Sequence, residues 1–164
     1  MAERILTQTV NTVIDTTAGS NFPTAYLLNM NGSSSVSSGV LAVNMTSLKS
    51  PDTSTSRGFY FGLGMGHDLK YSFDYRFEPA TAGETAVLQV YWEGCDRNAL
   101  TFDTTWKTES RYVVRPIGSQ YSGFVFYQLS TKTFPLGTYY IRNLKFERTP
   151  WVFTIGGKPL KITV

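Results

Sequence analysis

A strict alternation of large apolar and polar side chains runs through residues 69–78, LKYSFDYRFE. Successive side chains of an extended strand point to opposite faces of a sheet, so the two sets lie on opposite faces. The apolar set is Leu69, Tyr71, Phe73, Tyr75 and Phe77, and the polar set is Lys70, Ser72, Asp74, Arg76 and Glu78. A strand of this kind is typical of an antiparallel sheet that covers a core on one side.

Other segments of the chain also have the character of strands. They are residues 40–43, 59–65, 86–92, 106–115, 123–129 and 138–146, with short apolar runs at 10–14 and 25–30. The polar stretches 32–39 (GSSSVSSG) and 50–58 (SPDTSTSRG) are expected to be loops. No segment keeps a 3.6-residue apolar period, so little helix is expected and an all-β sandwich is predicted.

The last fifteen residues form a separate signal. Two short apolar segments, 151–155 and 160–164, flank the pair Gly156-Gly157, which suits a tight hairpin turn. A two-stranded hairpin is marginally stable alone, so it is expected to pack on the sandwich or on a neighbouring subunit. The residues predicted to make such a docking contact are Trp151, Phe153, Lys158 and Lys161.

Composition fits one β domain. The chain has 164 residues, of which 15% are aromatic and only 16% charged. Cys95 is the only cysteine, which excludes a disulfide within the chain. The first residues lack the features of a signal peptide, and no apolar run reaches the length of a membrane span. The protein is therefore expected to be made in a cytoplasm and to stay there, or to leave by lysis or a dedicated route.

Catalytic patterns are weak. Asp74 and Glu78 share a strand face but lie about 13 Å apart along it, beyond the roughly 5–9.5 Å of glycosidase carboxylate pairs. No spacing rule selects the other loop carboxylates, which are Glu93, Asp96 and Asp103. His67 is the only histidine, and no Gly-x-Ser-x-Gly motif is present. The sequence therefore predicts a protein that is not an enzyme and that uses no cofactor.

Glycan binding is a second line of inference, because sugars stack on exposed aromatic rings and bond to planar polar side chains. In segment 86–92 the apolar face is expected in the core, which leaves the opposite face for a ligand. The candidate glycan face consists of Asp74, Arg76, Gln89, Tyr91, Tyr127 and Gln128. Ordinary cross-strand pairing on a solvated sheet is the alternative. Trp106 and Trp151 are expected to be core or interface anchors.

Three glycines alternate in the segment GLGMG. At period two, Gly62, Gly64 and Gly66 share one face, where a bare backbone permits close approach. Two interpretations stay open, which are close packing of protein against protein and a sugar groove.

Residues 69–148, about half of the chain, resemble the jelly-roll carbohydrate-binding modules of xylan- and glucan-degrading enzymes, a galactose-binding-like fold. The motifs that carry the resemblance are Tyr71-Ser72-Phe73, residues 87–92, Thr104-Thr105-Trp106-Lys107 and residues 140–147, YIRNLKFE. Many relatives have an acidic calcium ligand after the Tyr-Ile pair. Arg142 stands there in this sequence, and a cation cannot bind calcium, so no metal site is expected.

The sequence thus predicts an antiparallel jelly-roll β-sandwich over residues 25–148, an N-terminal extension over 1–24 and a C-terminal hairpin over 149–164. The leading functional hypothesis is a non-catalytic accessory protein of a bacteriophage virion, assembled in the host cytoplasm. Its expected partners are other virion proteins or further copies of the chain, and glycans, but not nucleic acid or membranes. A free-standing carbohydrate-binding module for cell-surface or plant polysaccharide is the alternative, and a small hydrolase is a third.

Overall fold

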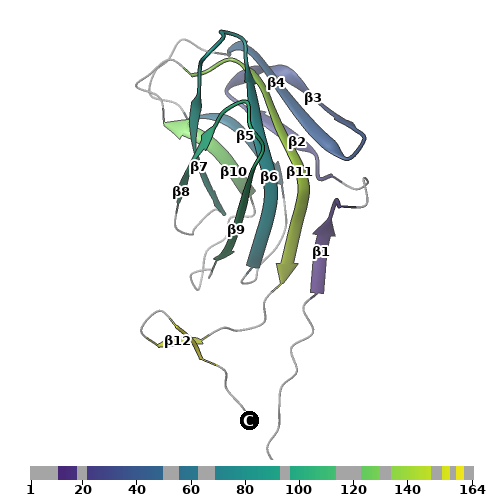
Figure 1. Ribbon diagram of the computed structural model, residues 1–164, viewed down its shortest axis with the longest axis vertical. Coiled ribbons are helices and arrows are strands. Elements are labelled where there is room, and N and C mark those ends of the chain that lie inside the picture. Colours follow the sequence, from purple (N-terminus) through teal and green to yellow (C-terminus); the bar gives the residue numbers. More distant parts are fainter. Residues whose placement is uncertain are drawn as a thin grey trace, which may run out of the picture.

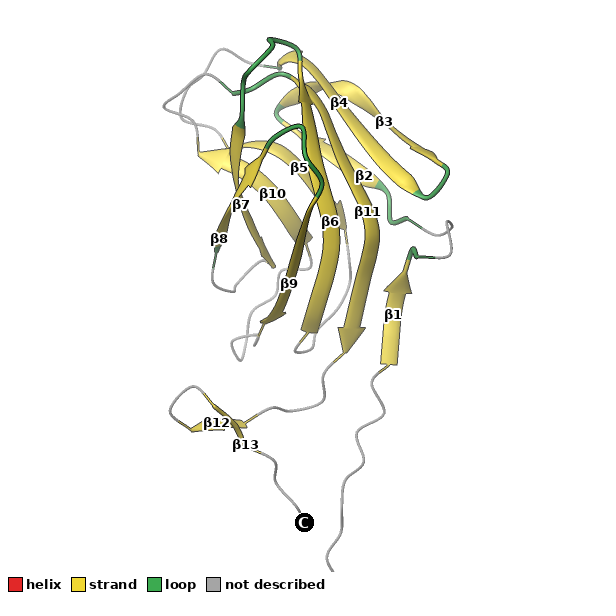
Figure 2. Cartoon of the chain, viewed as in Figure 1, coloured by secondary structure: helices red, strands yellow, loops and turns green. Residues whose placement is uncertain are grey.

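The chain forms two packed β-sheets in this computed structural model (Figures 1 and 2). The structure describes residues 11–17, 22–49, 56–62, 69–92, 97–113, 123–129, 134–148, 153–155 and 158–160. Within these ranges every regular element is a strand, and none is a helix able to cross a membrane. The predicted all-β antiparallel sandwich is confirmed, while jelly-roll connectivity stays a prediction.

Two sheets, called sheet A and sheet B, make up the sandwich. Sheet A contains β1 (Asn11–Asp15), β3 (Met30–Ser37), β4 (Val40–Leu48), β6 (Leu69–Pro79), β9 (Lys107–Val113) and β11 (Gly137–Arg148). Sheet B contains β2 (Ala25–Leu28), β5 (Ser56–Gly62), β7 (Ala86–Trp92), β8 (Asn98–Phe102) and β10 (Gly123–Leu129). The strand orders are β3-β4-β11-β6-β9 and β2-β5-β10-β7-β8, and β1 also pairs with β11.

The core between the sheets is rich in aromatic rings. On β6, Tyr71, Phe73, Tyr75 and Phe77 are buried, as their alternation predicts. The Phe73 ring meets rings of β10 across the interface, with centroids 5.3 Å from Phe126 and 6.1 Å from Phe124. The three residues of β7 that were expected in the core are buried as well; they are Leu88, Val90 and Trp92.

Strand β11 is paired along both of its edges. One edge runs beside β6, and the other is shared by β4 and then β1, which lies beyond the end of β4 (Figure 1). Between the two partners β11 bulges, where Asn143 adopts a left-handed φ of 53°. Buried Thr16 fills this gap, since its Oγ1 accepts a 2.8 Å hydrogen bond from the Leu144 amide. Part of the predicted N-terminal extension therefore belongs to sheet A.

The prediction of a loop over residues 32–39 is wrong. Residues up to Ser37 form the edge strand β3, and only Ser38 and Gly39, with φ of 50° and 73°, make the turn into β4. Serine and glycine are poor strand formers, but pairing along the whole of β4 overrides this local preference. The short strand β8 was also not anticipated, and β5 begins at Ser56, inside the second predicted loop.

Gly58 offers a test of the contact between β5 and β10. Its φ is +149°, and an added Cβ would overlap the carbonyl oxygen of Phe126 on the neighbouring strand. Gly58→Ala is expected to lower the free energy of unfolding by at least about 3 kcal/mol in urea titration.

The matched control is Gly83→Ala, since Gly83 also has a positive φ, of +84°, but nothing lies within 4 Å of its added Cβ. That variant should cost only roughly 1–2 kcal/mol. Equal losses for the two variants would contradict the close approach of β5 and β10 at Gly58.

Candidate functional site

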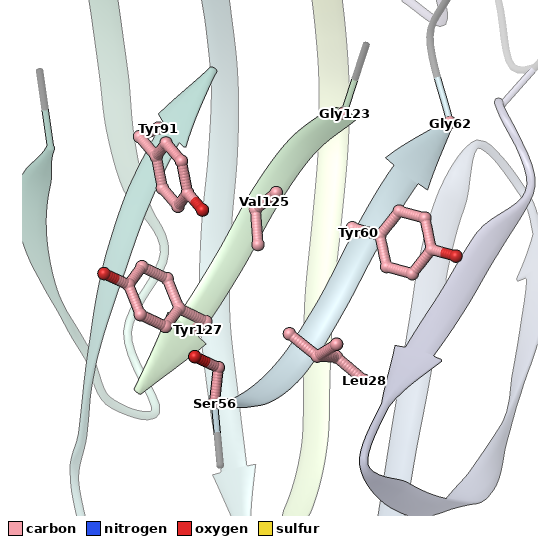
Figure 3. Close-up of a pocket in the computed structure, with 8 residues that line it drawn as sticks. All are labelled: Leu28, Ser56, Tyr60, Gly62, Tyr91, Gly123, Val125 and Tyr127. Atoms are coloured by element: carbon pink, nitrogen blue, oxygen red, sulfur yellow. The ribbon is translucent and has the colours of Figure 1, made fainter. Parts of the chain in front are cut away.

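A pocket of about 440 Å³ lies on the outer face of sheet B. Four adjacent strands, β2, β5, β10 and β7, contribute to it. Its lining residues are Leu28, Ser56, Tyr60, Gly62, Tyr91, Gly123, Val125 and Tyr127. Figure 3 shows Val125 in the middle, with the rings of Tyr91 and Tyr127 on one side and that of Tyr60 on the other.

Three tyrosines and one valine stand in a row that crosses the strands. Tyr26 of β2 is the direct partner of Tyr60 on β5, Tyr60 pairs with Val125 on β10, and Val125 pairs with Tyr91 on β7. Neighbouring strands lie about 4.8 Å apart, so the row spans about 14 Å across the sheet. We call these four residues the tyrosine row.

Glycines border one side of the tyrosine row. Gly62 and Gly123 are cross-strand partners, two residues along from Tyr60 and Val125, and both line the pocket. A Cβ on Gly62 would meet only the Tyr26 ring, at 3.6 Å, so the glycine leaves space beside that ring. One of the three glycines with an expected shared face therefore borders a pocket, while Gly64 and Gly66 lie outside the described residues.

Ring contacts hold the two ends of the row. Tyr26 stacks on Tyr60 with centroids 5.2 Å apart, and the Tyr91 ring meets Tyr127 edge to face at 5.3 Å. The Arg97 guanidinium lies 5.3 Å from the Tyr91 ring centroid and 5.4 Å from that of Tyr127. The hydroxyl oxygen of Tyr127 is buried without a hydrogen-bond partner in the part of the chain that the structure describes. Such an atom has an unmet capacity for a hydrogen bond.

The lining chemistry suits binding of a neutral polar ring. Tyrosine rings offer flat apolar surfaces, and their hydroxyls, with that of Ser56, offer donors and acceptors. None of the eight described lining residues carries a carboxylate, an imidazole or a thiol. The pocket as described therefore holds groups for recognition but no acid–base pair.

The six predicted glycan-face residues do not share a face, so that expectation is corrected. Gln89, Tyr91 and Tyr127 lie on the outer face of sheet B, where Tyr127 is the cross-strand partner of Gln89. Asp74 and Arg76 lie on the outer face of sheet A, on the far side of the sandwich, because β6 belongs to that sheet. Gln128 has the parity of buried Phe124 and Phe126 and therefore points inward.

Several pocket residues were missed by the sequence argument. They are Leu28, Ser56, Tyr60, Gly123 and Val125, with Tyr26 beside them in the tyrosine row. The segment Phe59-Tyr60-Phe61 carries a usable signal, since its two phenylalanines are buried and period two places Tyr60 opposite them. Which strands lie beside β5 is not readable from that alternation.

Asp74 is the centre of a hydrogen-bond network on sheet A. Its carboxylate accepts bonds from Thr108 Oγ1 at 2.7 Å, Asn143 Nδ2 at 2.8 Å and Arg142 Nε at 3.1 Å. Burial raises the pKa of Asp74, but the three hydrogen bonds and the Arg142 charge together outweigh it and hold the pKa below its ordinary value. The arrangement ties β6 to β9 and to the bulge of β11.

Trp106 was expected to be a core or an interface anchor. It is not in the core, so the first of these alternatives is wrong. Its half-buried ring lies under the guanidinium groups of Arg142, at 4.0 Å, and Arg76, at 5.3 Å. Arg76 also lies 4.3 Å from the Tyr140 ring. Arg142 thus binds Asp74 and covers Trp106. It stands where many carbohydrate-binding modules have an acidic calcium ligand.

The carboxylates of Asp103 and Glu78 also accept hydrogen bonds from neighbouring side chains. Asp103 accepts bonds from Lys107, 2.6 Å away, and from Thr105, which lower its pKa to about 2. A group with that pKa holds no proton to donate at neutral pH. Glu78 accepts a 2.8 Å bond from the Tyr140 hydroxyl. Glu93, Asp96 and His67 lie outside the described residues, and within those residues no metal-binding cluster of acids, histidines or cysteines occurs.

Comparisons with known proteins bear on the fold alone. No protein-family profile matches the chain, and no curated protein does. Among solved structures, the family 11 carbohydrate-binding module of Clostridium thermocellum, in complex with a beta-1,3-1,4-mixed-linked tetrasaccharide, matches at 18% identity and TM-score 0.46, over 75% of this chain and 86% of that one.

Two further matches are of the same kind. The apo BiXyn10A CBM1 structure matches at 17% identity and TM-score 0.46, over 83% of this chain and 96% of that one. The N-terminal cellulose-binding domain of Cellulomonas fimi beta-1,4-glucanase C matches at 10% identity and TM-score 0.44, over 77% of this chain and 90% of that one. The expected likeness to carbohydrate-binding modules recurs here as a likeness of fold. The similarity is too low to transfer a ligand or a site.

Asp74 is expected to act as a structural residue. Asp74→Asn should lower the free energy of unfolding by about 1–3 kcal/mol at pH 7, because the carboxylate bonds to Arg142, Asn143 and Thr108 are lost or weakened. The folded pKa lies below 3.8, so the carboxylate stabilises the fold above 3.8, and this contribution is lost as the pH falls through the folded pKa. The difference from wild type should therefore shrink in urea titrations at decreasing pH.

Glu84→Gln, at an exposed turn residue, is the control and should stay near wild type. A difference between Asp74→Asn and wild type that does not change with pH would show that the carboxylate charge has no part in the network.

Proposed function

We propose that this protein is a non-catalytic glycan-binding module that holds its ligand in the sheet B pocket. The observation that carries the proposal is the tyrosine row, in which three tyrosines stand in register across the strands and two of them, Tyr60 and Tyr91, line the pocket. Tyr60 and Tyr91 are half-buried, and neither belongs to the core between the sheets, so their rings are partly accessible at the pocket.

The row suits an extended oligosaccharide. Sugar rings present C–H faces that stack on tyrosine, and their hydroxyls bond to phenol and serine oxygens. The row crosses the strands over about 14 Å, so a chain of linked rings would lie across the sheet and meet tyrosines on both sides of Val125. The exposed backbone at Gly62 admits a ring close to the sheet.

Binding without turnover is part of the proposal. Glycoside hydrolysis ordinarily requires two carboxyl groups on either side of the scissile bond. The described lining residues offer none, and Asp74 and Glu78 lie on the opposite sheet. A hydrolase would need carboxylates from segments outside the described residues.

Replacing pocket tyrosines tests the site. Tyr60→Ala and Tyr91→Ala are each expected to weaken binding about tenfold, because each removes one stacking surface. A glycan array finds the ligand, and calorimetry on the best glycan measures the affinities. The matched control is Tyr112→Ala, since Tyr112 is 63% exposed on the outer face of sheet A. No binding to any glycan, or an equal loss with Tyr112→Ala, would overturn the proposal.

A second proposal concerns the place of action. We propose that the chain is a virion accessory protein that is assembled in the host cytoplasm and attaches to other virion proteins, or to copies of itself, through its C-terminal hairpin. One observation favours it: β12 (Phe153–Ile155) and β13 (Lys158–Leu160) pair with each other and with neither large sheet. A two-stranded sheet is marginal alone, so a partner surface would stabilise it. Trp151 and Lys161 lie outside the described residues.

Truncation tests this attachment. A chain ending at Arg148 is expected to fold, because both large sheets remain complete, and to lose co-sedimentation with particles from the same source. Circular dichroism checks the fold of the truncated chain. Undiminished co-sedimentation would contradict docking by the hairpin.

A further inference from the structure

The described lining of the sheet B pocket is uncharged, but one cation stands beside it. Arg97 is exposed and comes immediately before β8. The pairing of β7 with β8 ends at Val90 and Asn98, so Arg97 is the next residue in that antiparallel series and falls beside Tyr91. It therefore extends the tyrosine row at its β7 end.

Two pocket tyrosines hold the Arg97 guanidinium in place. It lies at nearly equal distances from the ring centroids of Tyr91 and Tyr127, 5.3 Å and 5.4 Å. Contacts of this length are cation–π interactions, which hold the face of the guanidinium and direct its N–H donors along its edge, where a ligand can bond to them. A sugar that stacks on Tyr91 would therefore have a substituent within reach of a fixed cation.

From this placement we infer that the glycan is acidic: a polysaccharide with uronic acid units, whose carboxylate pairs with Arg97 while neighbouring rings stack on the tyrosine row. The inference rests on the proposed glycan-binding function and names its ligand class. Guanidinium and carboxylate match as planar two-point partners, and charge-assisted bonds are stronger than neutral ones.

A sulfate ester would offer similar chemistry, so the test must separate the two. The carboxylate is favoured because the described lining holds no second cation beside Arg97 to balance a more strongly charged, sulfated chain. One arginine on an uncharged pocket matches one carboxylate in a sugar unit.

The experiment compares glycans that differ only in charge. Polygalacturonate is compared with its methyl ester, and glucuronoxylan with its carboxyl-reduced form, each against the whole chain by affinity electrophoresis and calorimetry. Heparin and desulfated heparin form the sulfate arm. Wild type, Arg97→Gln, Arg97→Lys and Tyr91→Ala are measured at low and high salt.

The expected result is that wild type binds at least one uronate chain about tenfold or more tightly than its neutral form. Arg97→Gln should remove that preference, so that charged and neutral partners bind equally, and Arg97→Lys should restore only part of it. High salt should weaken uronate binding and spare neutral binding. Tyr91→Ala should weaken both.

Each other outcome has a distinct meaning. Equal binding of charged and neutral partners, unchanged in Arg97→Gln, overturns the acidic ligand and leaves the glycan-binding function standing. A preference for sulfated heparin that exceeds the uronate preference overturns the carboxylate. Absence of binding to every glycan overturns the proposed function itself.

Discussion

Packing of aromatic rings between the two sheets is the interaction on which the remaining structure depends. Phe126 of β10 stacks on Phe59 of β5 with centroids 4.5 Å apart, and Phe73 of β6 meets Phe126 from the opposite sheet. These rings are fully buried and too large to move to another register without leaving cavities. Because inner and outer side chains alternate, the inner phenylalanines decide that Tyr60 and Val125 face outward, where they form the pocket.

The two outer faces of the sandwich carry different side-chain contacts. On sheet A, Asp74 accepts three side-chain hydrogen bonds, and arginines cover Trp106. On the same face, the buried Nε of Arg76 has no hydrogen-bond partner among the described residues. On sheet B, tyrosine rings line a hollow, and the Tyr127 hydroxyl has no partner among the described residues.

The sequence argument succeeded where apolar and polar side chains alternate strongly. It failed where pairing with a neighbouring strand decides the conformation of a segment. The apolar faces of β6 and β7 were predicted residue by residue, because period two needs no knowledge of neighbours. The edge strand β3 was missed, since its serines carry no apolar signal and its conformation depends on pairing with β4. The structure divides the candidate glycan-face residues between the two sheets. Tyr91, Tyr127 and Gln89 share a face, whereas Asp74 and Arg76 belong to the other sheet.

By itself, then, the sequence determined the class of fold and the aromatic face of the strands that form the core. These follow from local alternation and from the free energy of burying apolar surface. Only the tertiary structure decided which outward side chains meet. The register of β2, β5, β10 and β7 brings Tyr26, Tyr60, Val125 and Tyr91 into one row, although up to 99 positions separate them along the chain, from 26 to 125. Strand order arises from long-range pairing of backbones, which no short stretch of sequence encodes.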